Sequence, residues 1–240
     1  MPNAERLMIA VVLQLALTAC GSSSRDLQAG GDQVSQPERD RSRMVGDQLR
    51  ARGIQNEAVL RTMGRLPRER FVPPDMRGRA YDDTALPIGH QQTISQPYIV
   101  AFMTQALEPR VTSKVLEVGT GSGYQAAVLA SIVHEVYTIE IIPELAAAAE
   151  RTLSDLGIRN VHVRTGDGYV GWPEAQPFDG IVVTAAPDHV PQPLVDQLAV
   201  GGQMAIPVGT DIQELLVISK TASGVIQRRT LDVRFVPLRR

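Results

Sequence analysis

Apolar residues follow two spacings along this chain, and the spacing separates predicted strands from predicted helices. Short apolar runs and alternating stretches predict strands, whereas apolar residues three and four positions apart predict helices. We expect strands at 114–118, 135–140, 161–165, 178–184, 203–207, 214–220 and 227–236. We expect helices at 96–107, 123–133, 143–156 and 191–197, the first with Ser95 as its N-cap.

The order of these elements predicts the fold class. Strands alternate with helices and are mostly apolar, which is typical of a parallel sheet covered on both faces. The last two strands have no helical pattern between them and predict an antiparallel hairpin at the sheet edge. Two short helices at 37–66, interrupted at Gly53, are expected to cap the domain, and 67–95 is expected to be a long loop. The sequence thus predicts an α/β fold with a doubly wound, mostly parallel Rossmann-like sheet, an antiparallel C-terminal edge and N-terminal capping helices.

The first 43 residues have a different pattern from the rest. An apolar run at 7–17 is too short to span a bilayer but suits the core of a signal peptide. It leads into Leu17-Thr-Ala-Cys-Gly21, which resembles the bacterial lipoprotein cleavage box, in which the cysteine is lipidated.

We therefore divide the chain into a lipoprotein-type signal segment at 1–20, a disordered tether at 21–43 and a domain at 44–240. In this interpretation a lipidated Cys20 would tether the protein to a membrane. The alternative interpretation is a misassigned start, with Met44 opening the protein.

Composition excludes several classes of function. The chain has 240 residues, 43% of them hydrophobic, which suits one substantial core. Its 24 Lys and Arg nearly balance 26 Asp and Glu, so we expect no nucleic-acid binding. One cysteine cannot form an internal disulfide, and the four histidines lack metal-ligand spacing, so we expect no metal site.

A glycine-rich turn follows the first predicted strand of the sheet. The strand carries Glu117 near its end, and Gly119, Gly121 and Gly123 follow it before a helix begins. Without Cβ atoms this turn lets backbone approach a ligand closely. Tyr124 stands where the dinucleotide fingerprint needs its third glycine, which argues against NAD or FAD, and no Lys-Ser or Lys-Thr follows to make a P-loop.

Acidic residues end the next two predicted strands. Glu140 ends the second strand, where a carboxylate can accept hydrogen bonds from a ribose diol. Asp167 and Gly168 end the third, where the acid could accept from an adenine amino group. Taken singly, these features also suit a packing turn, a helix N-terminal acid and a turn former. Together, in this order, they favour a mononucleoside such as S-adenosylmethionine as the ligand.

Several motifs from Met44 to the end resemble those of the protein-L-isoaspartate O-methyltransferase family. On the cofactor side these are Leu116-Glu-Val-Gly-Thr-Gly-Ser-Gly-Tyr124 and Gly166-Asp-Gly-Tyr-Val-Gly-Trp172. Phe178-Asp-Gly-Ile-Val-Val-Thr-Ala-Ala-Pro187 is similar to the family's fourth-strand signature. On the substrate side the motifs are Ala85-Leu-Pro-Ile-Gly89, Gln92-Thr-Ile-Ser-Gln-Pro-Tyr98, Gln197-Leu-Ala-Val-Gly-Gly-Gln-Met-Ala-Ile-Pro-Val-Gly209 and Arg234-Phe-Val-Pro-Leu238. Class I methyltransferases in general share the glycine turn and the acid, so the Thr-Ile-Ser-Gln-Pro loop specifies this family.

The resemblance implies a class I methyltransferase sheet, S-adenosylmethionine as methyl donor and isoaspartyl residues of damaged proteins and peptides as acceptors. Ser95 matches the position of the family's active-site serine, with Thr93 and Ile94 beside it in the substrate-side loop. A peptide substrate would run along extended backbone, for which Val208, Val236 and Leu238 are the candidates.

Two alternative functions stay open. One is a methyltransferase of the same fold that acts on another carboxylate, and the other is a membrane-tethered nucleoside-binding protein without turnover. Because S-adenosylmethionine is made in the cytosol, we expect a cytoplasmic enzyme, with an exported lipoprotein anchored at Cys20 as the alternative.

Overall fold

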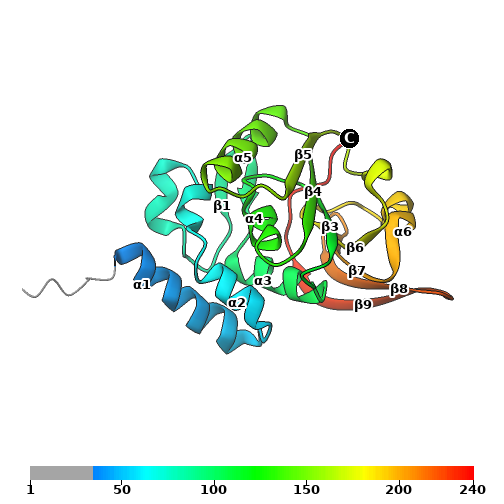
Figure 1. Cartoon of the computed structure of the whole chain (residues 1–240), viewed down its shortest axis with the longest axis horizontal. Helices are drawn as coiled ribbons and strands as arrows, with labels where there is room; N and C mark the ends of the chain where they lie inside the picture. The colour runs from blue at the N-terminus through cyan, green and yellow to red at the C-terminus, as the bar shows by residue number, and fades with distance from the viewer. Residues whose placement is uncertain (1–34) are drawn as a thin grey trace, which may run out of the picture. The chain divides into compact units, whose positions relative to one another are not determined.

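The computed structural model describes residues 35–240, which form a three-layer α/β domain around one large sheet (Figure 1). The strands lie in the order β5-β4-β3-β6-β7-β8-β9. Strands β3 to β7 are parallel, and β8 and β9 are antiparallel additions at one edge. The bounds are β3 Lys114–Val118, β4 Glu135–Glu140, β5 Val161–Thr165, β6 Phe178–Val183, β7 Leu198–Val208, β8 Gln213–Thr221 and β9 Gly224–Val233. The predicted fold class is confirmed, including the antiparallel C-terminal edge.

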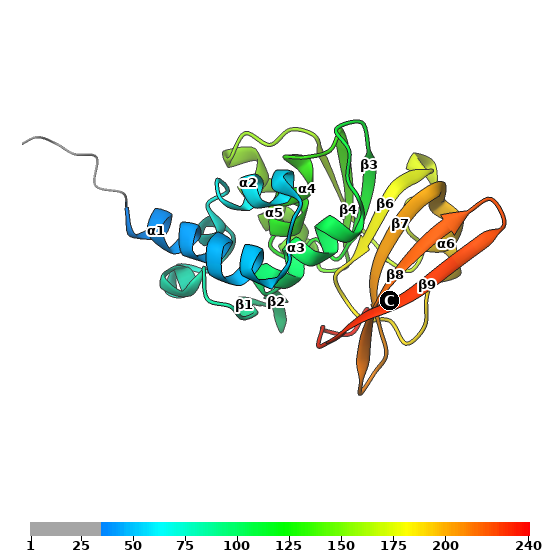
Figure 2. The ribbon, with the colours of Figure 1, turned by 90° about the horizontal axis from the view of Figure 1, so that it is seen from below.

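Two apolar cores lie on opposite faces of the sheet, because successive side chains of a strand point to opposite sides. On β3, Val115 belongs to the core that also contains buried residues of α2 to α5. The neighbouring Leu116 and Val118 belong to the other core, with Leu194 of α6. The helices are α1 Gln36–Arg43, α2 Glu57–Met63, α3 Pro97–Ala106, α4 Tyr124–Ala130, α5 Pro143–Asp155 and α6 Gln192–Gln197. Figure 2 shows α1 and α2 at one end of this domain and the β8–β9 hairpin at the other.

The predicted disordered tether at 21–43 is wrong over its last eight residues, which form helix α1. The cause is a capping box, in which the Ser35 hydroxyl accepts from the Glu38 amide and the Glu38 carboxylate accepts from the Ser35 amide. A π-helical segment at Met44–Leu49 and a 3-10 turn at Arg50–Arg52 continue the helix, and Gly53 ends it with a φ of 87°. The ordered domain therefore begins before Met44. Residues 1–34, with the predicted signal segment, Cys20 and the rest of the tether, lie outside the described residues.

Residues 67–95 contain more regular structure than the predicted loop. Short 3-10 turns occur at Arg68–Phe71 and Pro74–Arg79, and β1 Leu86–Gly89 pairs with β2 Gln92–Ile94 as a hairpin. Helix α3 then begins at Pro97 with Gln96 as its N-cap, so the prediction that Ser95 caps this helix is wrong. Within residues 35–240 no helix is long and apolar enough to cross a membrane.

Candidate active site

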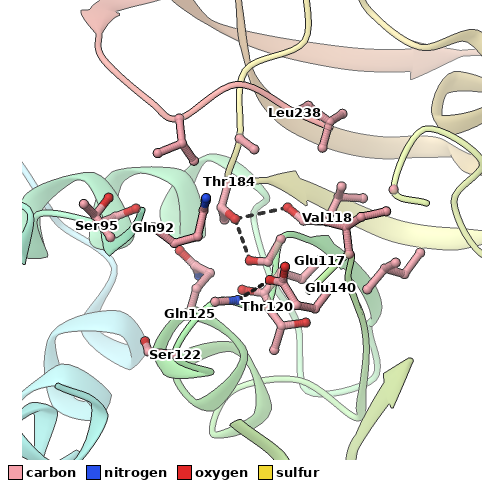
Figure 3. Close-up of a pocket in the computed structure, with 18 of the residues that line it drawn as sticks. Gln92, Ser95, Glu117, Val118, Thr120, Ser122, Gln125, Glu140, Thr184 and Leu238 are labelled. Carbon is pink, nitrogen blue, oxygen red and sulfur yellow. Dashed lines mark hydrogen bonds between the residues drawn. The ribbon is translucent and has the colours of Figure 1, made fainter. Parts of the chain in front are cut away.

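The order of the strands reverses at β3, and a hollow lies at this position. Strand β3 pairs with β4 on one side and with β6 on the other, so the connections that follow these strands diverge and leave a crevice at their carboxyl ends. In Figure 3, Ser95 and Gln92 lie on one side of the hollow, Glu117 and Glu140 on the other. The predicted cofactor and substrate elements therefore meet at one place.

The glycine turn after β3 has a backbone that favours glycine. Gly119, Gly121 and Gly123 have φ values of 95°, 52° and 83°. A Cβ on Gly119 would lie 2.4 Å from the Oγ1 atom of Thr184, which follows β6. The Thr184 hydroxyl lies 2.6 Å from the Gly119 carbonyl oxygen and 3.1 Å from that of Val118, and its single proton goes to the nearer acceptor. Thr184 thus clamps the turn against β6.

Glu140 supports the same turn from β4. Its Oε2 atom accepts from the Gly121 amide at 2.8 Å, and its Oε1 atom accepts from the Ile142 amide at 3.0 Å. The residue is only 5% exposed and lines the hollow. Each carboxylate oxygen can accept a second hydrogen bond, so Glu140 keeps acceptor capacity for a ligand.

Glu117 is a fully buried carboxyl group in the wall of the hollow. The Thr120 hydroxyl lies 2.7 Å from that of Thr138, which donates to Glu117 Oε2 at 2.6 Å. The Oε1 atom has no hydrogen-bond partner. Burial raises the pKa of Glu117 to about 8, with Glu140 adding to the rise and the Thr138 bond opposing it. Glu117 is therefore largely protonated at neutral pH and would ionise beside a cationic ligand.

The raised pKa of Glu117 predicts a pH-dependent stability. Between about pH 5 and about pH 8 the folded protein keeps a proton that the unfolded chain releases, so its free energy of unfolding falls as pH rises. Glu117→Gln removes this term, and we expect the variant to gain stability relative to wild type by roughly 1.4 kcal/mol per pH unit in this window. Urea unfolding at three pH values measures the gain. The exposed Glu144→Gln variant is the control, and a difference independent of pH would contradict the assignment.

Gly168 and the residues around Ser95 lie where the sequence predicts. Thr93, Ile94 and Ser95 line the hollow. So does Gly168, where a Cβ would lie 2.3 Å from Val118 Cγ1, so that only glycine fits beside β3.

Two predicted site residues do not line the hollow. Asp167 forms a turn instead, because its Oδ1 atom accepts from the Tyr169 amide at 2.8 Å. Val208 pairs with Glu214 at the end of β7 and packs against the apolar core, because β7 is longer than predicted. The site roles of Asp167 and Val208 stay predictions.

The C-terminal segment reaches the site because β9 ends earlier than predicted. The strand stops at Val233 rather than continuing to residue 236. The Ala186 amide then donates to the Val236 carbonyl oxygen at 2.8 Å, and the Leu238 amide donates to the Ala186 carbonyl oxygen at 2.9 Å. This pairing places Val236 and Leu238 in the wall of the hollow.

A second hollow adjoins the first. Asp83, Gln96 and Arg234 are among the residues that line it. The two hollows share Thr93, Ser95, Thr184 and Val236. These four residues mark the place where a ligand in one hollow meets a ligand in the other.

Several residues that line the hollow were not predicted as site residues from the sequence. Thr184 is the first polar residue after the apolar run of β6, and that strand-end position is a signal that could have identified it. Gln125 is almost fully buried in α4 and donates to the Thr104 hydroxyl at 2.8 Å, a contact with no local sequence signal. Gln92, Thr120, Ser122 and Arg239 are further polar residues of the lining.

The chemistry of the lining fits S-adenosylmethionine. A positive-φ glycine turn offers close backbone contact, and Glu117 and Glu140 place two carboxyl groups in the wall, one with an unpartnered oxygen. Acidic groups suit a cationic nucleoside and disfavour a polyphosphate. Among residues 35–240 no cluster of His, Cys, Asp or Glu could hold a metal ion.

Known proteins with the same sequence pattern and fold agree with this geometry. The protein-L-isoaspartate(D-aspartate) O-methyltransferase family matches residues 39–240. A protein-L-isoaspartate O-methyltransferase from Gloeobacter violaceus is 59% identical over 82% of this chain and 97% of its own length. Protein-L-isoaspartate O-methyltransferase 2 from Anaeromyxobacter sp. is 52% identical over 99% of this chain and 98% of its own length.

Solved structures give the same result. A protein-L-isoaspartate O-methyltransferase superposes with a TM-score of 0.75 at 29% identity, covering 82% of this chain and 65% of that chain. A Plasmodium falciparum protein assigned to the same activity, in complex with S-adenosyl-L-homocysteine, superposes with a TM-score of 0.72 at 28% identity, covering 83% and 98%. The chain therefore belongs to the protein-L-isoaspartate(D-aspartate) O-methyltransferase family.

Proposed function

We propose that this protein transfers the methyl group of S-adenosylmethionine to the α-carboxyl group of L-isoaspartyl residues in damaged proteins and peptides, which starts their repair. The observation that carries the proposal is the junction of two hollows at Ser95, one with nucleoside-binding features and one lined in part by residues 232–236 of the C-terminal segment. The names of the relatives support the choice of acceptor.

We assign the first hollow to the cofactor. The turn at Gly119, Gly121 and Gly123 would cradle it, Glu140 would accept from the ribose diol, and Glu117 would face its cationic part. Gly168 would let it lie close to β3. When bound, S-adenosylmethionine supplies an electrophilic methyl group on a sulfonium.

The acceptor side needs no strong base. A carboxyl group with a pKa near roughly 4 is already ionised at neutral pH, so the protein has to position it and remove its water. Ser95 would donate a hydrogen bond to one carboxylate oxygen and leave the other free to attack, with Thr93 as a second donor. Extended backbone near Val236, which lines both hollows, would line the path of the peptide, with Leu238 at the end next to the cofactor.

Replacing Ser95 with alanine is expected to lower kcat by about 10-fold while the affinity for S-adenosylhomocysteine stays unchanged. The reason is that the variant loses one hydrogen bond to the acceptor and none to the cofactor turn. Steady-state kinetics with an isoaspartyl peptide and calorimetry with S-adenosylhomocysteine measure the two quantities. The exposed Ser131→Ala variant serves as control, and an S95A enzyme with full activity would remove this role.

A labelling experiment tests the proposed function. The full-length protein is incubated with a radiolabelled methyl donor and either an isoaspartyl peptide or its normal aspartyl twin. We expect label in the isoaspartyl peptide only. Equal labelling of both peptides would point to a methyltransferase for carboxylates in general, and no labelling despite S-adenosylhomocysteine binding would favour a nucleoside-binding protein.

We infer that the protein works in the cytoplasm, where its methyl donor is made. The lipoprotein-like sequence at Cys20 supports the opposite location, a membrane tether outside that compartment. The intact mass of the protein from its native host decides between them. A start at Met1 or Met44 fits the inference, whereas a diacylated N-terminus at Cys20 would overturn it.

A further inference from the structure

Arg68 is a fully buried arginine next to the candidate active site, and no carboxylate of residues 35–240 forms an ion pair with it. Its exposed fraction is zero, and none of the ion pairs between described residues includes it. Burial lowers the pKa of Arg68, because the interior disfavours the charged form. Such a charge is costly to bury, so its contacts need an explanation.

The contacts of Arg68 reach both sides of the site. Its Nη2 atom donates to the Ser95 carbonyl oxygen at 2.7 Å, on the substrate side. Its guanidinium carbon lies 4.7 Å from the ring centre of Tyr124, the first residue of α4 after the glycine turn. Its Nε atom donates to the Ala80 carbonyl oxygen at 2.7 Å and holds the guanidinium in place. One side chain therefore joins the residue that faces the acceptor to the residue that follows the cofactor turn.

The contact between Arg68 and Tyr124 is incomplete. Within residues 35–240, neither Arg68 Nη1 nor the Tyr124 hydroxyl has a partner with good hydrogen-bond geometry, although the two side chains lie close enough for a hydrogen bond to affect both. Burial raises the pKa of Tyr124, and the Arg68 charge opposes that rise, so the two groups interact electrostatically. A buried donor beside a buried acceptor can gain a hydrogen bond through a small shift of the turn.

We propose that Arg68 is a positioning residue that links the glycine turn to Ser95 through Tyr124, so that filling the cofactor pocket fixes the Ser95 segment for methyl transfer. The proposal rests on the function proposed above for its kinetic part only. Lysine cannot replace arginine here, because one ammonium group cannot lie over the Tyr124 ring while donating to both carbonyl oxygens.

Amide hydrogen exchange with and without S-adenosylhomocysteine tests the link. In the wild type we expect the ligand to slow exchange both at 119–125 and at 94–98. In Arg68→Lys the slowing at 94–98 should fall at least fivefold while that at 119–125 stays within twofold of wild type. With saturating donor, kcat for an isoaspartyl peptide should fall about tenfold, with the affinity for S-adenosylhomocysteine within twofold of wild type.

Two further variants keep the test decisive. Arg70→Lys, an exposed neighbour on the same helical turn, should behave as wild type. Tyr124→Phe removes only the unpartnered hydroxyl and should keep the fold, yet reduce the slowing at 94–98 at least threefold. The link is overturned if the ligand slows exchange at 94–98 in R68K as much as in the wild type. If R68K does not fold, the same result in Y124F overturns it. A wild type in which the ligand does not slow exchange at 94–98 overturns it as well. If exchange behaves as expected but no isoaspartyl peptide is methylated, the proposed function fails and the link stands.

Discussion

Replacing Gly119 with alanine is expected to reduce the affinity for S-adenosylhomocysteine by at least about 100-fold, because the new methyl group cannot fit. Its Cβ would lie 2.4 Å from Thr184 Oγ1, at a φ of 95° that L side chains rarely adopt. The side chain of Thr184 cannot simply turn away, since its hydroxyl is bonded to the Gly119 carbonyl oxygen. The turn must therefore move, and its amides with it. Calorimetry with S-adenosylhomocysteine measures the loss.

Two further variants separate the clash from the backbone strain. Gly157 has a φ of 73°, and a Cβ there would have no other atom within 4 Å, so Gly157→Ala should cost about 1 kcal/mol of stability and leave ligand affinity unchanged. The double variant Gly119→Ala/Thr184→Ala removes the clashing oxygen and should recover part of the affinity. Unchanged affinity in G119A alone would show that the turn does not hold the cofactor.

Replacing Glu140 with glutamine is expected to lower the affinity for S-adenosylhomocysteine by about 100-fold and the free energy of unfolding by about 1–3 kcal/mol. In the wild type each carboxylate oxygen accepts from a backbone amide, those of Gly121 and Ile142. Glutamine keeps one acceptor and turns its own NH2 group toward the other amide, so one buried donor loses its partner. Calorimetry and urea unfolding measure the two effects.

Glu144→Gln provides the matched control for Glu140. It makes the same chemical change four residues later, on an exposed position in the first turn of α5, and should leave both quantities near wild type. A Glu140→Gln protein that binds S-adenosylhomocysteine with wild-type affinity would exclude Glu140 from the cofactor site.

The strands of the sheet were predictable because each is specified by residues that are close together in the sequence. The runs at Lys114–Val118, Glu135–Glu140 and Val161–Thr165 are strands with the predicted bounds, since each is short and rich in β-branched residues. Helix α1 was missed although Ser35 and Glu38 form a capping box, because the helix has no apolar face: none of its residues is buried, and distant contacts help to hold it. One such contact is the Arg41 bond to the Tyr81 hydroxyl at 2.9 Å, across 40 positions.

The candidate site was predictable where it lies at strand ends, and elsewhere it was not. Glu140 and the glycine turn follow from the order of strands, because parallel strands bring their carboxyl ends together. The role of Arg68 could not be predicted from the sequence, since it depends on the burial of the side chain beside Tyr124 and Ser95. Asp167 lies in a turn and Val208 at the end of a strand, outside the lining of the first hollow, and this placement depends on packing that the sequence does not reveal.

The clamp between Thr184 and Gly119 joins residues 65 positions apart, across the pairing of β3 with β6. Contacts of such sequence separation form late, after the loop between them has closed. A partly folded chain can therefore contain the glycine turn before the turn has its final shape. The cofactor therefore binds to molecules in which β6 has already paired with β3. By mass action, this binding stabilises the native state relative to folding intermediates.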